Sequence, residues 1–242
     1  MFCRYDLRTT DPDAARVFYA DVVGLDFAAG TDPAAADDPS CIAVWLLHEQ
    51  ARARGAPPHW LGQIGVTRVE ATRDRFVELG AERLSPPIQG PDGVTYATLR
   101  DPHGAVVAVR ESRKTSPRSP VAWHHLHTSD LDRSWAAYAE LFSWRHTETV
   151  EAVDPPGGFH LFAWDSGSES IGSMANTARA PGIHPHWLFY FSVADIEAAV
   201  AKVTSNGGTV SSAIATLPNG ARIVACEDGQ KCAFGLHAGV AR

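Results

Sequence analysis

Apolar and polar side chains alternate strictly over residues 3–8, which read Cys-Arg-Tyr-Asp-Leu-Arg. This period of two predicts a strand with one apolar face and one polar face. The pattern changes at Asp11-Pro12, because Asp is a preferred helix N-cap and Pro suits the first helical position. An apolar face with helical spacing follows and stops at Gly24, so a helix is expected between these two points.

The rest of the first half consists of short hydrophobic runs separated by turn residues. In order, they predict a short strand near 25–28, an acidic loop over 31–40, strands over 41–47 and 60–66, a helix over about 69–79 that Gly80 ends, and strands near 82–86, 94–100 and 105–111. Residues 60–111 therefore follow the order β-α-β-β-β, or close to it, which indicates an α+β fold.

The chain repeats itself, which is decisive for the fold. The segment 185–188 reads Pro-His-Trp-Leu, as does the segment 58–61, 127 positions earlier. The opening helix recurs after residue 120 at a different offset, 119, which carries Tyr19 onto Tyr138. The change in offset places an insertion in 165–184, where residues 170–174 are expected to add a fourth strand. We therefore predict four α/β modules that pair two by two.

A polar, proline-punctuated segment over 113–120 is typical of an interdomain linker. The predicted domains are residues 1–112, with modules at about 1–50 and 58–112, and residues 121–242, with modules at about 121–178 and 185–240. A length of 242 residues suits two domains of this size.

Composition narrows the class of function. The chain is 45% hydrophobic and 20% charged with a net charge of -7, so nucleic acid is not an expected partner, because phosphate binding requires a basic surface. No signal-like or membrane-spanning run occurs, so a cytoplasmic protein without a membrane partner is expected. The four cysteines lack paired zinc-site spacing and are expected to be reduced thiols.

Several motifs together resemble one superfamily. They are Asp11-Pro12, Phe18-Tyr19, Gly24-Leu25, the two Pro-His-Trp-Leu segments, Gly80 and Asp101-Pro102-His103-Gly104. They resemble the vicinal oxygen chelate superfamily, which includes glyoxalase I, bleomycin- and fosfomycin-resistance proteins and extradiol dioxygenases, and within it the tandem glyoxalase-like proteins. The resemblance implies tandem βαβββ modules, with two glyoxalase-like domains that each form a cup for a small molecule.

The resemblance also implies where a metal ion would be held, on the first and last strands of each cup. Carried onto this sequence, those positions are Arg4, Leu61, Ala108, Trp123, Leu188 and Gly235. None of these side chains is a ligand for a divalent cation. No cofactor is therefore predicted, and the alternative is a divalent Fe, Zn, Mn or Ni ion held by relocated ligands, His125, His127 and His237.

Strand alternation predicts which other side chains line the second cup. They are Trp123, His125, His127, Tyr190, Ser192 and His237. Histidine transfers protons near neutral pH, and Tyr190 could donate to a developing oxyanion, so acid–base catalysis by the histidines and Tyr190 is one hypothesis. The alternatives are the relocated metal site and histidines that only line the pocket. Trp123 and Ser192 are candidate ligand contacts, Trp123 by stacking on an aromatic ring.

The first cup is expected to be polar and cationic. Its predicted lining is Arg4, Asp6, Arg8, Gln63 and Arg110. These charges could form a structural ion-pair ladder, since charged groups that face a cavity must be paired or solvated. Alternatively, an arginine binds a carboxylate, phosphate or enolate oxygen of a ligand while Asp6 acts as the base.

Three functions remain open from the sequence. The first is a small-molecule enzyme without the usual metal that performs lyase- or isomerase-type chemistry on an oxygenated or aromatic metabolite. The second is a non-catalytic protein that sequesters a drug or metabolite. The third is a metal-dependent lyase or dioxygenase with relocated histidine ligands. The expected partner is a small molecule, and both a monomer and a homodimer are compatible with the sequence.

Overall fold

The computed structural model describes residues 1–26, 41–90, 92–112, 119–165, 167 and 169–239. The expected acidic loop and most of the expected linker lie outside these residues, as does part of the short strand expected near 25–28. The chain divides into two compact units. Unit 1 contains residues 1–4, 62–117 and 124–187, and unit 2 contains residues 5–61, 118–123 and 188–242. Each unit therefore combines an α/β module from the first half with one from the second half.

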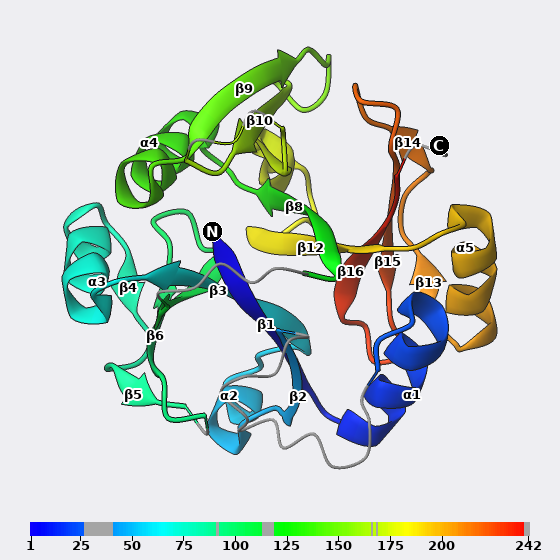
Figure 1. The fold of residues 1–242 in the computed structure, drawn as a ribbon, viewed down its shortest axis with the longest axis horizontal. Helices are drawn as coiled ribbons and strands as arrows, with labels where there is room; N and C mark the ends of the chain where they lie inside the picture. Colours follow the sequence, from blue (N-terminus) through cyan, green and yellow to red (C-terminus); the bar gives the residue numbers. More distant parts are fainter. Residues whose placement is uncertain (27–40, 91, 113–118, 166, 168, 240–242) are drawn as a thin grey trace. The chain divides into compact units, whose positions relative to one another are not determined.

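Unit 1 contains two runs of paired strands and two main helices. Its elements are the end of β3 (His59–Val66), α3 (Val69–Glu78), β4 (Glu82–Arg83), β5 (Ile88–Gln89), β6 (Thr95–Arg100), β7 (Val106–Glu111), the end of β8 (Val121–His127), α4 (Leu131–Phe142), β9 (Arg145–Val150), β10 (Phe159–Ala163), β11 (Gly172–Ala175) and the short 3-10 helix η1 (Asn176–Arg179). The strand orders are β3-β7-β6-β4, with β5 beside β6, and β8-β11-β10-β9. Helices α3 and α4 lie side by side (Figure 1).

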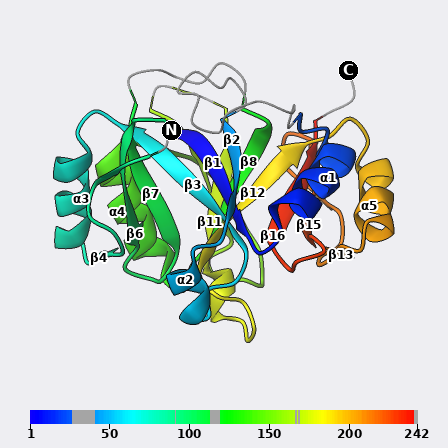
Figure 2. The same cartoon turned by 90° about the horizontal axis from the view of Figure 1, so that it is seen from below.

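Unit 2 is also built from strands and helices of both halves of the chain. Its elements are most of β1 (Phe2–Thr9), α1 (Pro12–Val23), β2 (Ile42–Leu46), α2 (Glu49–Ala53), most of β12 (His186–Ser192), α5 (Ile196–Ser205), β13 (Thr209–Val210), β14 (Ala215–Thr216), β15 (Arg222–Glu227) and β16 (Ala233–Ala238). Strand β1 pairs with β2 in parallel, and β12-β16-β15-β13 form a run with β14 beside β15. Helices α1 and α5 pack against each other, as Figure 2 shows. The predicted α+β class with paired βαβββ modules is confirmed.

The predicted helix boundaries follow from local chemistry. Asp11 caps α1 by accepting a hydrogen bond from the Ala14 amide at 3.0 Å, and Pro12 occupies the first turn. Gly24 ends the helix at a φ of 69°, a left-handed conformation that favours glycine. The strand predicted within 170–174 is present as β11, so the shifted repeat offset located a real insertion.

The first half differs from the expectation after β2. The chain forms the five-residue helix α2, which the sequence pattern did not indicate. Its N-cap is His48, which is not among the preferred capping residues. A helix this short has no apolar periodicity to detect. The strand expected over 82–86 is limited to the two residues of β4.

The repeated residues of the sequence meet in two buried hydrogen-bond relays. In unit 1, the Trp187 indole donates to the Tyr138 hydroxyl at 3.0 Å, and that hydroxyl donates to Asp101 Oδ2 at 3.1 Å. In unit 2, Trp60, Tyr19 and Asp228 form the same relay at 3.0 and 3.2 Å.

Each relay joins a helix, the start of a repeat strand and the turn between two strands. The Pro-His-Trp-Leu repeat is therefore explained in part by its tryptophan, whose only polar atom is satisfied inside the core. None of the described helices combines the length and apolar character needed to cross a bilayer.

Candidate functional site

Three histidine rings lie against one another in unit 1. His125 and His127 are two residues apart on β8, so their side chains leave the same face of the strand. Their ring centroids are 4.4 Å apart. His186, at the start of β12, stacks on His127 at 4.4 Å with an interplanar angle of 20°. We call His125, His127 and His186 the imidazole cluster.

Neighbouring elements fix the orientation of each ring. Strand β11 pairs with β8 in parallel and places Ser173 beside His125, whose Nδ1 lies 2.7 Å from the Ser173 Oγ. The Nδ1 of His127 lies 2.7 Å from the Thr177 Oγ1 in η1. The Nδ1 of His186 lies 2.7 Å from the carbonyl oxygen of His184. Because a carbonyl only accepts, this Nδ1 carries the proton in the neutral ring and the Nε2 has a lone pair.

Burial keeps the imidazole cluster neutral at pH 7. His125 is 5% exposed, and desolvation, with a smaller effect of His186, lowers its pKa to about 3. Desolvation also lowers the pKa of His127, and the neighbouring His125 and His186 add to that effect. The pKa of His186 is lowered as well, chiefly by burial. Three adjacent imidazoles could not all be protonated, since like charges at this separation repel.

The other residues predicted for the second cup belong to unit 2. Tyr190 is buried, and its burial raises the pKa of its hydroxyl. Ser192 is exposed and pairs with His237 in the parallel β12–β16 ladder. His237 is partly buried, and desolvation lowers its pKa. Trp123 is 2% exposed, and its buried indole N–H has no hydrogen-bond partner among the described residues.

The positions at which the resemblance places metal ligands do not fit a metal ion. Leu61, Ala108 and Leu188 are buried apolar side chains. Gly235 has no side chain, and the space beside its Cα is filled by the ring of Tyr190, which a Cβ would overlap. Within the described ranges, no three His, Cys, Asp or Glu residues form a group that could hold a metal ion.

Enlarging Gly235 should therefore be costly. Gly235→Ala is expected to destabilise the chain by about 1–3 kcal/mol, because the new methyl group must displace the Tyr190 ring. Gly239→Ala is the matched control, since nothing lies within 4 Å of a Cβ at that position. Urea unfolding of both variants measures the difference. Equal stability of the two variants would contradict this packing.

The residues predicted for the first cup separate into two groups. In unit 1, Arg4 of β1 and Arg110 of β7 converge on the carboxylate of Asp92. Gln63 is also in unit 1, buried at 1% exposure and paired with Ala108.

Asp6 and Arg8 of β1 form a pair in unit 2. Their Oδ2 and Nη2 atoms are 3.0 Å apart, and the Arg8 guanidinium lies 5.8 Å from the centroid of the Trp45 ring. Every predicted arginine of the first cup therefore has an acidic partner: Arg4 and Arg110 share Asp92, and Arg8 has Asp6.

Sequence reasoning missed several members of these clusters. Asp92 lies in a turn, and nothing in the pattern indicates that its side chain reaches two strands. His186 is part of the repeated Pro-His-Trp-Leu segment, and nothing in that repeat indicates a contact with His127. Ser173 and Thr177 lie in the insertion. The change in repeat offset was the only signal that pointed to that segment.

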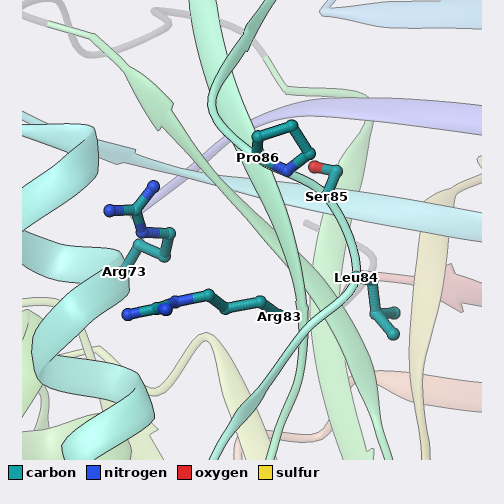
Figure 3. A pocket seen from close by; sticks show the side chains of 5 residues that line it. All are labelled: Arg73, Arg83, Leu84, Ser85 and Pro86. Atoms are coloured by element: carbon teal, nitrogen blue, oxygen red, sulfur yellow. The ribbon is translucent and has the colours of Figure 1, made fainter.

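A shallow surface pocket in unit 1 lies between α3 and residues 83–86, which begin with the last residue of β4. It is lined by Arg73, Arg83, Leu84, Ser85 and Pro86 (Figure 3). Both guanidiniums pair with the exposed carboxylate of Asp74, at 2.8 and 3.0 Å. This pocket contains none of the residues predicted from the sequence.

Two family models match the chain in tandem. The first, described as a glyoxalase-like domain, matches residues 4–110. The second, described as the Glyoxalase/Bleomycin resistance protein/Dioxygenase superfamily, matches residues 121–232. The two matches lie on either side of the segment predicted to be the linker.

Two individual proteins are similar to this chain over most of its length. CFP32 of Mycobacterium bovis, a proposed glyoxylase, is 25% identical over 96% of this chain and 92% of its own length. The anthracycline biosynthesis protein DnrV of Streptomyces peucetius is 22% identical over 90% of this chain and 86% of its own.

Solved structures share the fold. The Mn(II)-bound glyoxalase from Novosphingobium aromaticivorans has a TM-score of 0.64 at 12% identity, over 99% of this chain and 82% of its own. The halotolerant catechol dioxygenase BphC has a TM-score of 0.66 at 14% identity, over 98% of this chain and 86% of its own. At these identities the likeness concerns the fold alone.

Proposed function

Since this chain belongs to the glyoxalase/bleomycin resistance protein/dioxygenase superfamily, with one glyoxalase-family domain in each half, we propose that it is a small-molecule enzyme that transfers protons with neutral histidines in place of the usual metal ion. The reaction is of the lyase or isomerase type, and the substrate is an oxygenated or aromatic metabolite. The relative named for anthracycline biosynthesis supports a role in secondary metabolism.

The imidazole cluster is the observation that carries this proposal. Each neutral imidazole offers one N–H donor and one lone pair. In a buried site, one ring can donate to a carbonyl or enolate oxygen of the substrate while a neighbouring ring accepts a proton. The hydroxyls of Ser173 and Thr177 orient His125 and His127 for these roles.

The low pKa values keep these rings unprotonated at pH 7 and make each resting ring a weak base. A ring that is neutral at pH 7 is available as a donor and acceptor at every physiological pH. Negative charge that develops on the substrate raises the pKa of the accepting ring during the step, because an opposite charge favours the imidazolium form. His186, which is half-buried, then exchanges the proton with solvent.

Exchange of substrate hydrogen with deuterated water tests the proposal, since it requires only a compound that the site can bind and deprotonate. The full chain, dialysed against a chelator, would be incubated in D2O with a panel of hydroxyketones, dicarbonyl compounds and phenols, and mass spectrometry would detect incorporated deuterium. We expect catalysed exchange for at least one class. His125→Gln and His127→Gln should slow it by about 100- to 10,000-fold, the usual contribution of general acid–base catalysis.

His48→Gln is the control for these variants, because His48 is exposed at the N-cap of the short helix α2 in unit 2. It should leave the exchange rate unchanged. Tight binding of a panel compound without exchange or turnover would favour the sequestering protein instead. Exchange that disappears on chelation and returns with an added divalent cation would favour the metal-dependent alternative.

A further inference from the structure

The two arginines of unit 1 converge on a single carboxylate oxygen. The Arg4 Nη1 lies 3.4 Å from the Asp92 Oδ2, and the Arg110 Nη2 donates to the same oxygen. All three side chains are buried, with exposures of 9% for each arginine and 2% for Asp92. Convergent guanidiniums form strong charge-assisted hydrogen bonds with carboxylates and phosphates.

The carboxylate comes from a tight turn rather than from a strand. Asp92 lies between β5 and β6, where the Gly90 amide donates to the Val94 carbonyl at 2.9 Å. Its Oδ1 accepts from the Val94 amide at 3.2 Å. A Cβ at position 90 would lie 2.8 Å from this Oδ1, so glycine provides the space that the inward-facing carboxylate needs.

We propose that Arg4 and Arg110 form a binding site for an oxyanion of a small-molecule ligand, and that the Asp92 carboxylate is a built-in occupant which the ligand replaces. The arginines are held on two strands, whereas rotation of one short side chain on a turn removes Asp92. A paired anion stabilises a buried guanidinium, so a ligand oxyanion can take over the role of the departing carboxylate.

The site shares no residue with the imidazole cluster. It therefore does not depend on the proposed proton transfer, and each can fail without the other.

Removal of the built-in carboxylate tests this proposal. Asp92→Ala and Asp92→Asn would be titrated calorimetrically with acetate, oxalate and inorganic phosphate, each against sodium chloride of equal ionic strength. Affinity for at least one oxyanion should rise at least tenfold above that of the native chain. Near a concentration of 100 Kd, that oxyanion should raise the Tm of the variant by on the order of 5 °C. Comparison of the titrations with acetate and oxalate against the titration with phosphate shows whether the site prefers a carboxylate or a phosphate.

Asp74→Ala is the matched control, because Asp74 also bridges two arginines, Arg73 and Arg83, but on the surface. It should gain no comparable affinity. Gly90→Ala is an independent variant that forces the Asp92 carboxylate outward without removing it, and it should show the same gain.

Adding Arg110→Ala to Asp92→Ala should abolish the gain, while His125→Gln should leave it intact. If none of the Asp92 and Gly90 variants binds an oxyanion better than the native chain, or if the gain survives the loss of Arg110, the proposal is wrong.

Discussion

Replacing Asp101 with alanine is expected to destabilise the chain by about 3 kcal/mol or more, because two backbone amides and the buried Tyr138 hydroxyl lose their acceptor at once. The Oδ1 accepts from the amides of His103 and Ala105 at 2.9 and 3.0 Å, and the Oδ2 accepts from the Tyr138 hydroxyl at 3.1 Å. Burial raises the pKa of the Asp101 carboxyl because desolvation disfavours its charged form. The hydrogen bonds that both of its oxygens accept act in the opposite direction. Urea unfolding measures the loss.

The conservative variant separates hydrogen bonding from packing. Asp101→Asn keeps a carbonyl oxygen for the two amides and should cost about 1 kcal/mol, near the value of one hydrogen bond. The repeat provides an internal replicate, since Asp228 accepts from the amides of Gln230 and Cys232 and from Tyr19 in the same geometry. Asp101→Ala within about 0.5 kcal/mol of the native chain, the usual range for surface substitutions, would contradict the role of the relay.

Stability is expected to fall steeply as the pH drops below about 6.5, the pKa of an unfolded histidine. In the folded chain, burial lowers the pKa of His124 to about 4 and that of His125 to about 3. The unfolded chain therefore binds more protons between these values and 6.5, so acid favours unfolding. Each histidine should contribute a loss of roughly 2 kcal/mol by pH 5, and the two together about 4 kcal/mol.

Difference measurements isolate this effect from other titrations. The raised pKa values of Asp101 and Asp228 act in the opposite direction, because their stabilisation is lost as the pH rises through the folded value. In the native chain the unfolding free energy rises with pH, partly because unfolding lets His125 bind a proton. His125→Gln removes this contribution, so the rise should be smaller by about 1.4 kcal/mol per pH unit than in the native chain. The exposed His48→Gln variant should keep the native slope. A native slope in His125→Gln would show that this ring is not buried in its neutral form.

The sequence predicted the elements that depend on local chemistry. The cap of α1 at Asp11 and its end at Gly24 are properties of a few adjacent residues. The presence of β11 followed from a change in repeat spacing, which is also visible in the chain alone. Helix α2 was missed because five residues carry no detectable periodicity and its cap is unusual.

The candidate site was predictable only in part, for a physical reason. Alternation along β8 correctly placed His125 and His127 on one face. It could not show that His186 stacks on His127, because that contact joins strands far apart in the sequence. The same limit applies to Asp92, whose turn sequence gives no information about the two arginines that it meets. Long-range polar contacts depend on tertiary packing rather than on local pattern.

Metal content decides whether the histidines act without an ion. The full chain would be equilibrated in turn with Fe(II), Zn(II), Mn(II) and Ni(II) and freed of excess ion. Elemental mass spectrometry would then measure the number of metal ions bound per chain. We expect no stoichiometric ion in the native chain, since the inherited ligand positions hold Arg4, Trp123, Gly235 and buried apolar side chains. One tightly bound ion per chain that is lost in His125→Ala, His127→Ala and His237→Ala would contradict proton transfer by metal-free histidines.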